Sequence, residues 1–158
     1  MQIMAHFINV REANTIDIPL INEILRHSKA YWGYEDSFME AFMNKFSLDE
    51  TYLKQYIVKV VCLEGQVIGF FSFIYEKEKL ELDYFFLHPR HIGKGYGKKA
   101  WDACCAFARE LNVSEVTLIS DPNAETFYQK MGCKKIGNKE SPFIKGRYLP
   151  VMRYVFVN

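Results

Sequence analysis

The most informative segment of this chain is HPRHIGKGYGKKAWDACCAFARELNV, residues 88–113. Its first half is a short loop with three glycines and four basic residues, and its second half has the spacing of an amphipathic helix. The first turn of a helix leaves backbone N–H groups unpaired and carries the positive end of the helix dipole. A glycine-rich, cationic loop that opens a helix therefore predicts an anion-binding site, with phosphate as the usual ligand.

The residues before this segment predict helices followed by an antiparallel meander. AHFINV (5–10) is typical of a first short strand. Apolar residues then recur at helical spacing over Ile16–Arg26, with Asp17 as the expected cap, and over Glu35–Lys45. Three apolar stretches separated by EGQ and EKEK turns follow, and the third is predicted as a strand over Leu80–Leu87.

The residues after it predict a strand–helix–strand unit. SEVTLIS (114–120) is typical of a strand, DPNAETFYQKMG (121–132) of a helix, and CKKIG and LPVMRYVFV of two final strands. No internal repeat or change of composition marks a domain boundary. We therefore predict one α/β domain over residues 1–158: a mixed sheet, made of an antiparallel meander and a βαβ unit, with helices on both faces.

The composition favours a globular protein. The chain has 158 residues, 49% of them hydrophobic and 25% charged, with a net charge of +1. This charge argues against extensive contact with nucleic acid or a membrane surface. The N-terminus lacks a signal-peptide pattern, and the longest apolar run, GFFSFIY, is too short to span a bilayer. Four cysteines without a CxxC pair predict buried thiols in a cytoplasmic protein, with neither disulfides nor a metal site.

The loop differs from two well-known phosphate motifs. A P-loop needs glycine where Ile92 stands and Ser or Thr where Lys99 stands. A dinucleotide fingerprint needs the spacing GxGxxG, whereas Gly93, Gly95 and Gly97 give GxGxG. A turn that is basic without binding any ligand remains an alternative on spacing alone.

Two blocks together resemble the GCN5-related N-acetyltransferase superfamily. HPRHIGKGYG after LELDYFFL matches its loop, in which Gln or Arg is followed by two residues, Gly, one residue, and Gly or Ala. SDPNAETFYQKMG, in the next strand and helix, matches its Asn-Ala-x-x-Phe-Tyr-x-x-x-Gly block. Counted from the His-Pro pair, the Gln or Arg position of the family falls at Ile92, so a polar side chain is missing there, and Arg90 satisfies the pattern only in a register shifted by two residues.

The resemblance implies that acetyl-CoA is the acyl donor and that an amine is the acceptor. In the family the loop binds the pyrophosphate of coenzyme A through main-chain N–H groups, and the pantetheine arm enters between two splayed parallel strands. The implied cofactor-binding residues come from the last meander strand, the loop and the second block: Phe85, Phe86, Leu87, Ile92, Gly93, Lys94, Gly95, Tyr96, Gly97, Lys98, Asn123, Phe127 and Tyr128.

The resemblance also implies catalytic roles. Tyr128 matches the tyrosine that protonates the departing thiolate, and a backbone N–H near Phe85–Leu87 would meet the oxyanion. Asp83 stands where many members carry the general base, although Glu81 or a water could take this role. Strict alternation along the strand predicts that both carboxylates share a face with Phe85 and Leu87. Packing of Tyr128 and solvent exposure of the acids are the competing interpretations.

The acceptor pocket is expected from the segment between the first two helices. Tyr31, Trp32, Tyr34 and Glu35 offer aromatic walls and a carboxylate that suit a cationic amine, although they could also pack the helix junction. Arg147 could reach the same pocket or stay at the surface. Related proteins frequently dimerise, so a homodimer is a further expectation. Two other functions remain open: an inactive CoA-binding sensor, and a protein that binds ATP or NAD through the loop.

Overall fold

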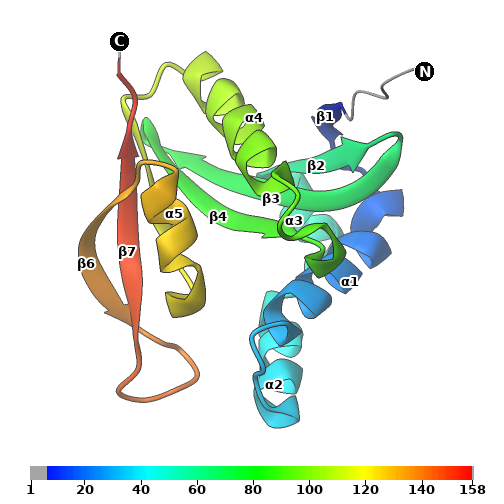
Figure 1. The fold of residues 1–158 in the computed structure, drawn as a ribbon, viewed down its shortest axis with the longest axis vertical. Coiled ribbons are helices and arrows are strands. Elements are labelled where there is room, and N and C mark those ends of the chain that lie inside the picture. Colours follow the sequence, from blue (N-terminus) through cyan, green and yellow to red (C-terminus); the bar gives the residue numbers. More distant parts are fainter. Residues whose placement is uncertain (1–6, 158) are drawn as a thin grey trace.

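The computed structural model describes residues 7–157 and shows a seven-stranded mixed sheet flanked by helices (Figure 1). The strands are β1 (Ile8–Glu12), β2 (Ile57–Leu63), β3 (Gln66–Glu76), β4 (Lys79–Leu87), β5 (Glu115–Ile119), β6 (Lys134–Glu140) and β7 (Tyr148–Val155). The helices are α1 (Ile18–Ala30), α2 (Asp36–Phe46), α3 (Glu50–Gln55), α4 (Tyr96–Glu110) and α5 (Glu125–Lys130). The spatial order β1-β2-β3-β4-β5-β7-β6 confirms the predicted α/β fold.

The first helix and the last one differ from the sequence prediction in their detail. Helix α1 begins at Ile18 and continues to Ala30, and it follows a 3₁₀ turn over Thr15–Asp17 that is capped by Asn14, whose Oδ1 accepts the N–H of Ile16 at 3.0 Å. Asp17 occupies the N-cap position of α1 as predicted, but its carboxylate makes no capping hydrogen bond to α1 and instead accepts two hydrogen bonds from the Arg11 guanidinium. The predicted helix over residues 121–132 is a 3₁₀ turn followed by α5. Residues 5 and 6 of AHFINV lie outside the described residues.

Two hydrophobic clusters lie on opposite faces of the sheet. One is built around α4 and α5 and includes Trp101 and Tyr128. The other is built around α1 and α2 and includes Ile24 and Phe42. Burial of these apolar faces is the main stabilising contribution to the fold, and it fixes which side chains of the central strands point to each side.

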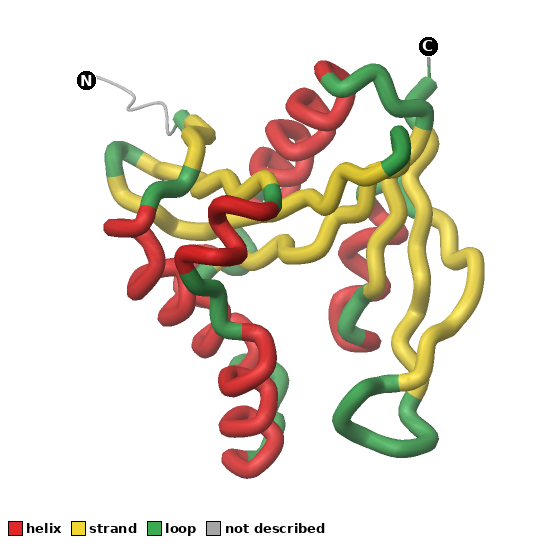
Figure 2. The backbone as a smooth tube through the Cα atoms, turned by 180° about the vertical axis from the view of Figure 1, so that it is seen from behind, coloured by secondary structure: helices red, strands yellow, loops and turns green. Residues whose placement is uncertain are grey.

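The sheet opens between β4 and β5, its only parallel neighbours among the described strands. These strands pair over only three positions, Leu80–Leu82 with Val116–Leu118. Beyond them β4 follows the meander, while β5, β7 and β6 form a second arm with α5 (Figures 1 and 2). The backbone of β4 from Asp83 onward therefore has no strand partner on the β5 side.

A β-bulge interrupts β4 where the opening starts. Ser72 of β3 lies opposite Tyr84, but the next residue, Phe73, lies opposite Leu82. Asp83 is therefore the extra residue of the bulge, and strict alternation of side chains ends there.

Candidate active site

Two cavities meet at the opening between β4 and β5. The larger cavity has a volume of about 590 Å³ and lies on the α4–α5 side, and the smaller has about 390 Å³ and lies on the α2 side. Their shared lining consists of Lys29, Leu82, Asp83, Phe86, Ile119, Ser120 and Asp121. A ligand in one cavity can therefore meet a ligand in the other beside the bulge of β4.

The glycine loop forms one end of the larger cavity. Gly93 and Gly95 have φ values of +80° and +82°, and a Cβ added to either would have no neighbouring atom within 4 Å. These two glycines are thus required by the left-handed backbone and leave open space beside the first turn of α4. Gly97 has another role, because a Cβ there would lie 3.1 Å from the ring of Phe127. It lets α4 approach α5 closely.

The basic side chains of the loop are partly engaged elsewhere. Lys98 donates to Asp102 at 3.1 Å, and Lys99 lies 5.6 Å from the ring centre of Tyr96. Tyr96 itself is buried in the core, and Ile92 is half exposed at the cavity lining. The backbone N–H groups at the start of α4 are therefore better placed than these lysines to hold an anion.

Tyr128 lies in the wall of the larger cavity. Its ring packs against Trp101 and Phe127, and burial raises the pKa of its hydroxyl. Among residues 7–157 this hydroxyl has no hydrogen-bond partner, so it remains available to a ligand. A tyrosine with a raised pKa stays protonated at neutral pH and can donate a proton.

Asp83 lies where the two cavities meet. Its Oδ2 accepts a hydrogen bond of 2.5 Å from the hydroxyl of Tyr52 on α3, which also contacts the Oγ of the fully buried Ser72 at 2.8 Å. The prediction that Asp83 and Glu81 share a face with Phe85 and Leu87 was wrong. Phe85 and Leu87 pack on the α4 side, whereas Asp83, at the bulge, faces Tyr52 of α3, and Glu81 lines only the smaller cavity.

The surroundings of Asp83 favour its neutral form. The neighbouring protein limits its hydration and raises the pKa of the carboxyl, and the hydrogen bond from Tyr52 lowers it only in part. The pKa of Glu81 is also raised, first by burial and then by the charge of Asp83. Neither carboxylate has an ion-pair partner within 4.0 Å among the described residues. Asp83 is exposed to solvent, but its raised pKa and the absence of a cation partner make it a candidate general base.

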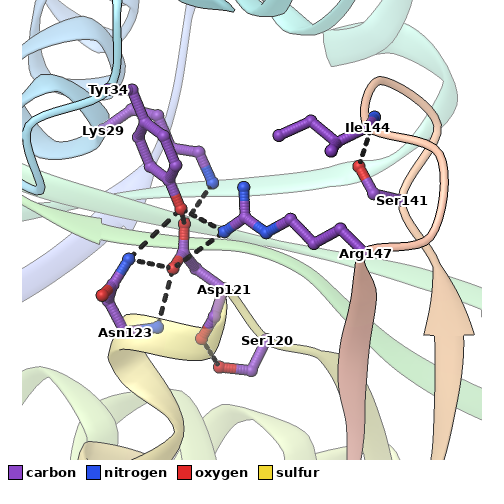
Figure 3. A network of polar contacts seen from close by, with 8 residues as sticks. All are labelled: Lys29, Tyr34, Ser120, Asp121, Asn123, Ser141, Ile144 and Arg147. Carbon is purple, nitrogen blue, oxygen red and sulfur yellow. Dashed lines mark hydrogen bonds and ion pairs between the residues drawn. The ribbon is translucent and has the colours of Figure 1, made fainter.

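The other carboxylate at the opening, Asp121, is the centre of a polar network (Figure 3). It accepts hydrogen bonds of 2.6 Å from Lys29 and from the Tyr34 hydroxyl, and of 2.9 Å from Asn123. Arg147 lies 3.9 Å from its Oδ1 and donates to Tyr34. Burial opposes ionisation, but Lys29 and these hydrogen bonds lower the pKa of Asp121. The network joins α1 to the second arm across the opening.

The residues predicted to bind the acceptor do not lie together. Tyr31 and Trp32 line the larger cavity, with ring centres 5.0 Å apart. Tyr34 belongs to the Asp121 network, and Glu35 is exposed and lines neither cavity. Asn123, expected at the pantetheine arm or as a cap, lines the larger cavity and also holds Asp121.

Five phenylalanines form the wall of the smaller cavity: Phe38, Phe42, Phe46, Phe86 and Phe143. Of these, the sequence predicted a site role only for Phe86, at the cofactor. Phe38, Phe42 and Phe46 recur at i, i+4 spacing in the sequence, so they share one face of α2. Nothing in the sequence placed the other two beside them. We refer to these five residues as the phenylalanine box.

Among residues 7–157, no group of three or more His, Cys, Asp or Glu side chains is arranged to hold a metal ion. None of the helices in that range is long and apolar enough to cross a membrane. The four cysteines are buried free thiols.

The opened sheet, the glycine loop at a helix start and the paired cavities define an architecture built to bring two ligands together, as the sequence resemblance implied. The model of the acetyltransferase (GNAT) family matches residues 19–133. The chain belongs to this family. A search of curated proteins by sequence gave no match.

Solved structures with this fold include several N-acetyltransferases. PaiA N-acetyltransferase of Thermoplasma acidophilum, in complex with coenzyme A, has a TM-score of 0.79 at 18% identity, over 95% of this chain and 99% of that chain. A GCN5-related N-acetyltransferase from Rhodopseudomonas palustris has a TM-score of 0.77 at 19% identity, over 98% of this chain and 100% of that chain. YncA of Salmonella typhimurium, a putative acetyltransferase with its cofactor acetyl-CoA, has a TM-score of 0.65 at 20% identity, over 96% of this chain and 95% of that chain. At these low sequence identities, the similarity shows a shared fold.

Proposed function

We propose that this protein transfers an acetyl group from acetyl-CoA directly to the amine of an acceptor. One observation carries the proposal: Asp83 lies at the junction of the two cavities, whereas Tyr128 lines only the larger one. A base beside the acceptor and an acid beside the donor are what acyl transfer to an amine requires. Membership of the acetyltransferase family and the coenzyme A complexes of proteins with this fold support the same reaction.

The larger cavity takes the donor in this proposal. The pyrophosphate lies at the first turn of α4, where Gly93 and Gly95 leave open space and unpaired N–H groups face the ligand. The pantetheine arm pairs with the unpartnered backbone of β4 over Phe85–Leu87. The Leu87 carbonyl already accepts a hydrogen bond of 2.7 Å from Ser28, so pairing with the arm uses other groups of this segment.

The reaction follows from the positions of Asp83 and Tyr128. Asp83, directly or through a water, takes a proton from the acceptor ammonium, and the neutral nitrogen attacks the thioester carbonyl carbon. A carbon–nitrogen bond forms, the carbon–sulfur bond breaks, and a backbone N–H of β4 stabilises the oxyanion. Tyr128 protonates the thiolate. The products are the N-acetylated acceptor, coenzyme A and one proton.

The chain forms a single catalytic domain in this proposal, and it acts in the cytoplasm. Four buried cysteines without a disulfide agree with a reducing compartment. A homodimer remains a prediction that sedimentation of the purified protein would test.

Calorimetric titration tests donor binding. Acetyl-CoA and coenzyme A are expected to bind one-to-one, and ATP and NAD are not. Absence of binding by acetyl-CoA would refute the proposed function. Binding of acetyl-CoA without transfer to any amine of a broad panel would identify an inactive CoA sensor instead.

Substitution of Tyr128 by Phe tests the acid. Turnover is expected to fall about 100-fold while the affinity for acetyl-CoA is retained, because only the proton donor is lost. Tyr154→Phe is the matched control, since Tyr154 packs against Trp101 but does not line the larger cavity. Equal turnover of wild type and Tyr128→Phe would remove Tyr128 from the mechanism.

A further inference from the structure

We propose that the acceptor is a free α-amino acid with an apolar, preferably aromatic, side chain, whose carboxylate is bound by Arg147. This inference rests on the proposed function and names the substrate class of the smaller cavity. Three features of that cavity carry it: an aromatic wall, an acidic residue without a cation partner, and a guanidinium with unused donors.

The wall of the smaller cavity suits an apolar side chain. The phenylalanine box contributes rings from α2, β4 and the loop before β7, and Phe143 packs edge-on against Phe38 and Phe46 at ring-centre distances of 5.7 and 5.6 Å. A volume of about 390 Å³ accommodates one small molecule rather than a folded protein surface. Burial of an aromatic side chain between such rings contributes both apolar area and edge-to-face contacts.

Asp83 provides the position for the amine. Its Oδ2 is bonded to Tyr52, and its carboxylate has no ion pair among residues 7–157. An ammonium bound beside it lies next to the opening of the sheet, where the larger cavity begins. The amine of the acceptor is thereby directed toward the donor.

Arg147 provides the position for the carboxylate. Its side chain is 21% exposed and lines the smaller cavity. Only one terminal nitrogen is engaged, with Tyr34 and at 3.9 Å from Asp121. The remaining nitrogens have no partner among the described residues, and Figure 3 shows the end of the guanidinium extending beyond this network. A guanidinium with free, parallel N–H groups matches a carboxylate.

The charges around this network favour an anion as well. Lys29 and Arg147 carry two positive charges, and Asp121 carries one negative charge between them. The network therefore keeps a net charge of +1 beside the cavity. Lys45, at the rim of the same cavity, lies over the Phe46 and Phe143 rings and has no ion pair among the described residues. Glu81, Asp83, Glu140 and Lys139 also line the smaller cavity, so the preference for an anion holds at its Arg147 end, where a carboxylate is bound more favourably than a second positive charge of the acceptor.

Steady-state transfer to three acceptors tests the inference with the full chain and acetyl-CoA. The acceptors are L-phenylalanine, L-phenylalaninamide, which lacks the carboxylate, and spermidine, which lacks both the ring and the carboxylate. L-Phenylalanine is expected to have the highest kcat/KM of the three. Its value should be about 10- to 100-fold above that of the amide, because the amide loses the charge-assisted pair of hydrogen bonds between the carboxylate and Arg147.

L-Phenylalanine and its amide also differ in the basicity of their amines, and this difference affects kcat/KM as well. The variant Arg147→Gln separates the two effects, because only binding of the carboxylate depends on Arg147. The ratio of kcat/KM for L-phenylalanine and its amide should fall about 10-fold or more in this variant. In the matched control Arg153→Gln the ratio should not change, because Arg153 pairs with Glu115 at 3.6 Å and lines neither cavity. Acetyl-CoA titration of each variant shows that it has folded and binds the donor.

Three results would overturn the inference. The first is a higher kcat/KM for spermidine than for L-phenylalanine, and the second is an equal or higher value for the amide. The third is an unchanged ratio in Arg147→Gln. In all three cases acetyl transfer itself continues and the proposed function stands. Failure to bind acetyl-CoA at all would instead refute both.

Discussion

Asp83 and Asp121 face the same opening of the sheet, and both line the two cavities, yet their surroundings are opposite. Asp121 has a lysine, a tyrosine, an arginine and an amide around it, and its pKa is lowered. Asp83 has one tyrosine hydroxyl and no cation, and its pKa is raised. One carboxylate joins the two arms of the fold, while the other has no cation partner, and the proposed function uses this second carboxylate to exchange a proton.

Removing the carboxylate of Asp83 should have the largest effect on activity. Asp83→Asn is expected to lower kcat about 100- to 1000-fold at neutral pH, because the amine loses its proton acceptor. The affinity for acetyl-CoA should not change. Single-turnover kinetics together with calorimetry would measure both. A loss of less than tenfold would transfer the role of base to Glu81 or to a water.

Removing the charge of Asp121 should act on stability instead. Asp121→Asn is expected to lower the free energy of unfolding by about 2–4 kcal/mol, because Lys29 and Arg147 then face each other without a counter-ion. Urea unfolding would measure it. Glu115→Gln is the control, since its pair with Arg153 is exposed and should contribute less than about 1 kcal/mol. Similar losses in the two variants would show that the network does not hold the arms together.

The pH dependence of stability sharpens the same comparison. The folded pKa of Asp121 is lowered, so its stabilisation is complete above the unfolded value of about 3.9 and is lost as the pH falls through the folded pKa. The folded pKa of Asp83 is raised, so its contribution is present below that unfolded value and is lost as the pH rises through the folded pKa. The advantage of wild type over Asp121→Asn should therefore shrink in acid, whereas any gain in Asp83→Asn should grow toward neutral pH.

Substitution of Tyr52 by Phe is expected to have the smallest effect on activity. The Tyr52 hydroxyl donates to Asp83 and lowers the pKa of that carboxyl, so Tyr52→Phe should raise this pKa further. The acidic limb of the kcat/KM profile should move to higher pH, with a loss of about two- to tenfold on that limb and less at alkaline pH. A uniform loss at every pH would mean that Tyr52 only supports the fold.

The sequence by itself determined the order of the elements and the loop. Apolar periodicity and turn residues are local signals, so the meander, the βαβ unit and the glycine loop before α4 could be predicted from them. The two motif blocks led to the acetyltransferase family, which the match over residues 19–133 bears out. The motif blocks also predict catalytic roles for Tyr128 and Asp83, and these roles remain predictions.

Only the tertiary structure decided how the site is arranged. The bulge at Asp83 depends on register between β3 and β4, which alternation along one strand cannot reveal, and it turned the carboxylate to the opposite face from the one predicted. The phenylalanine box and the Asp121 network combine residues more than 80 positions apart, such as Lys29 with Asp121. Contacts of this kind arise from the packing of the two arms across the opening, and no local pattern encodes them.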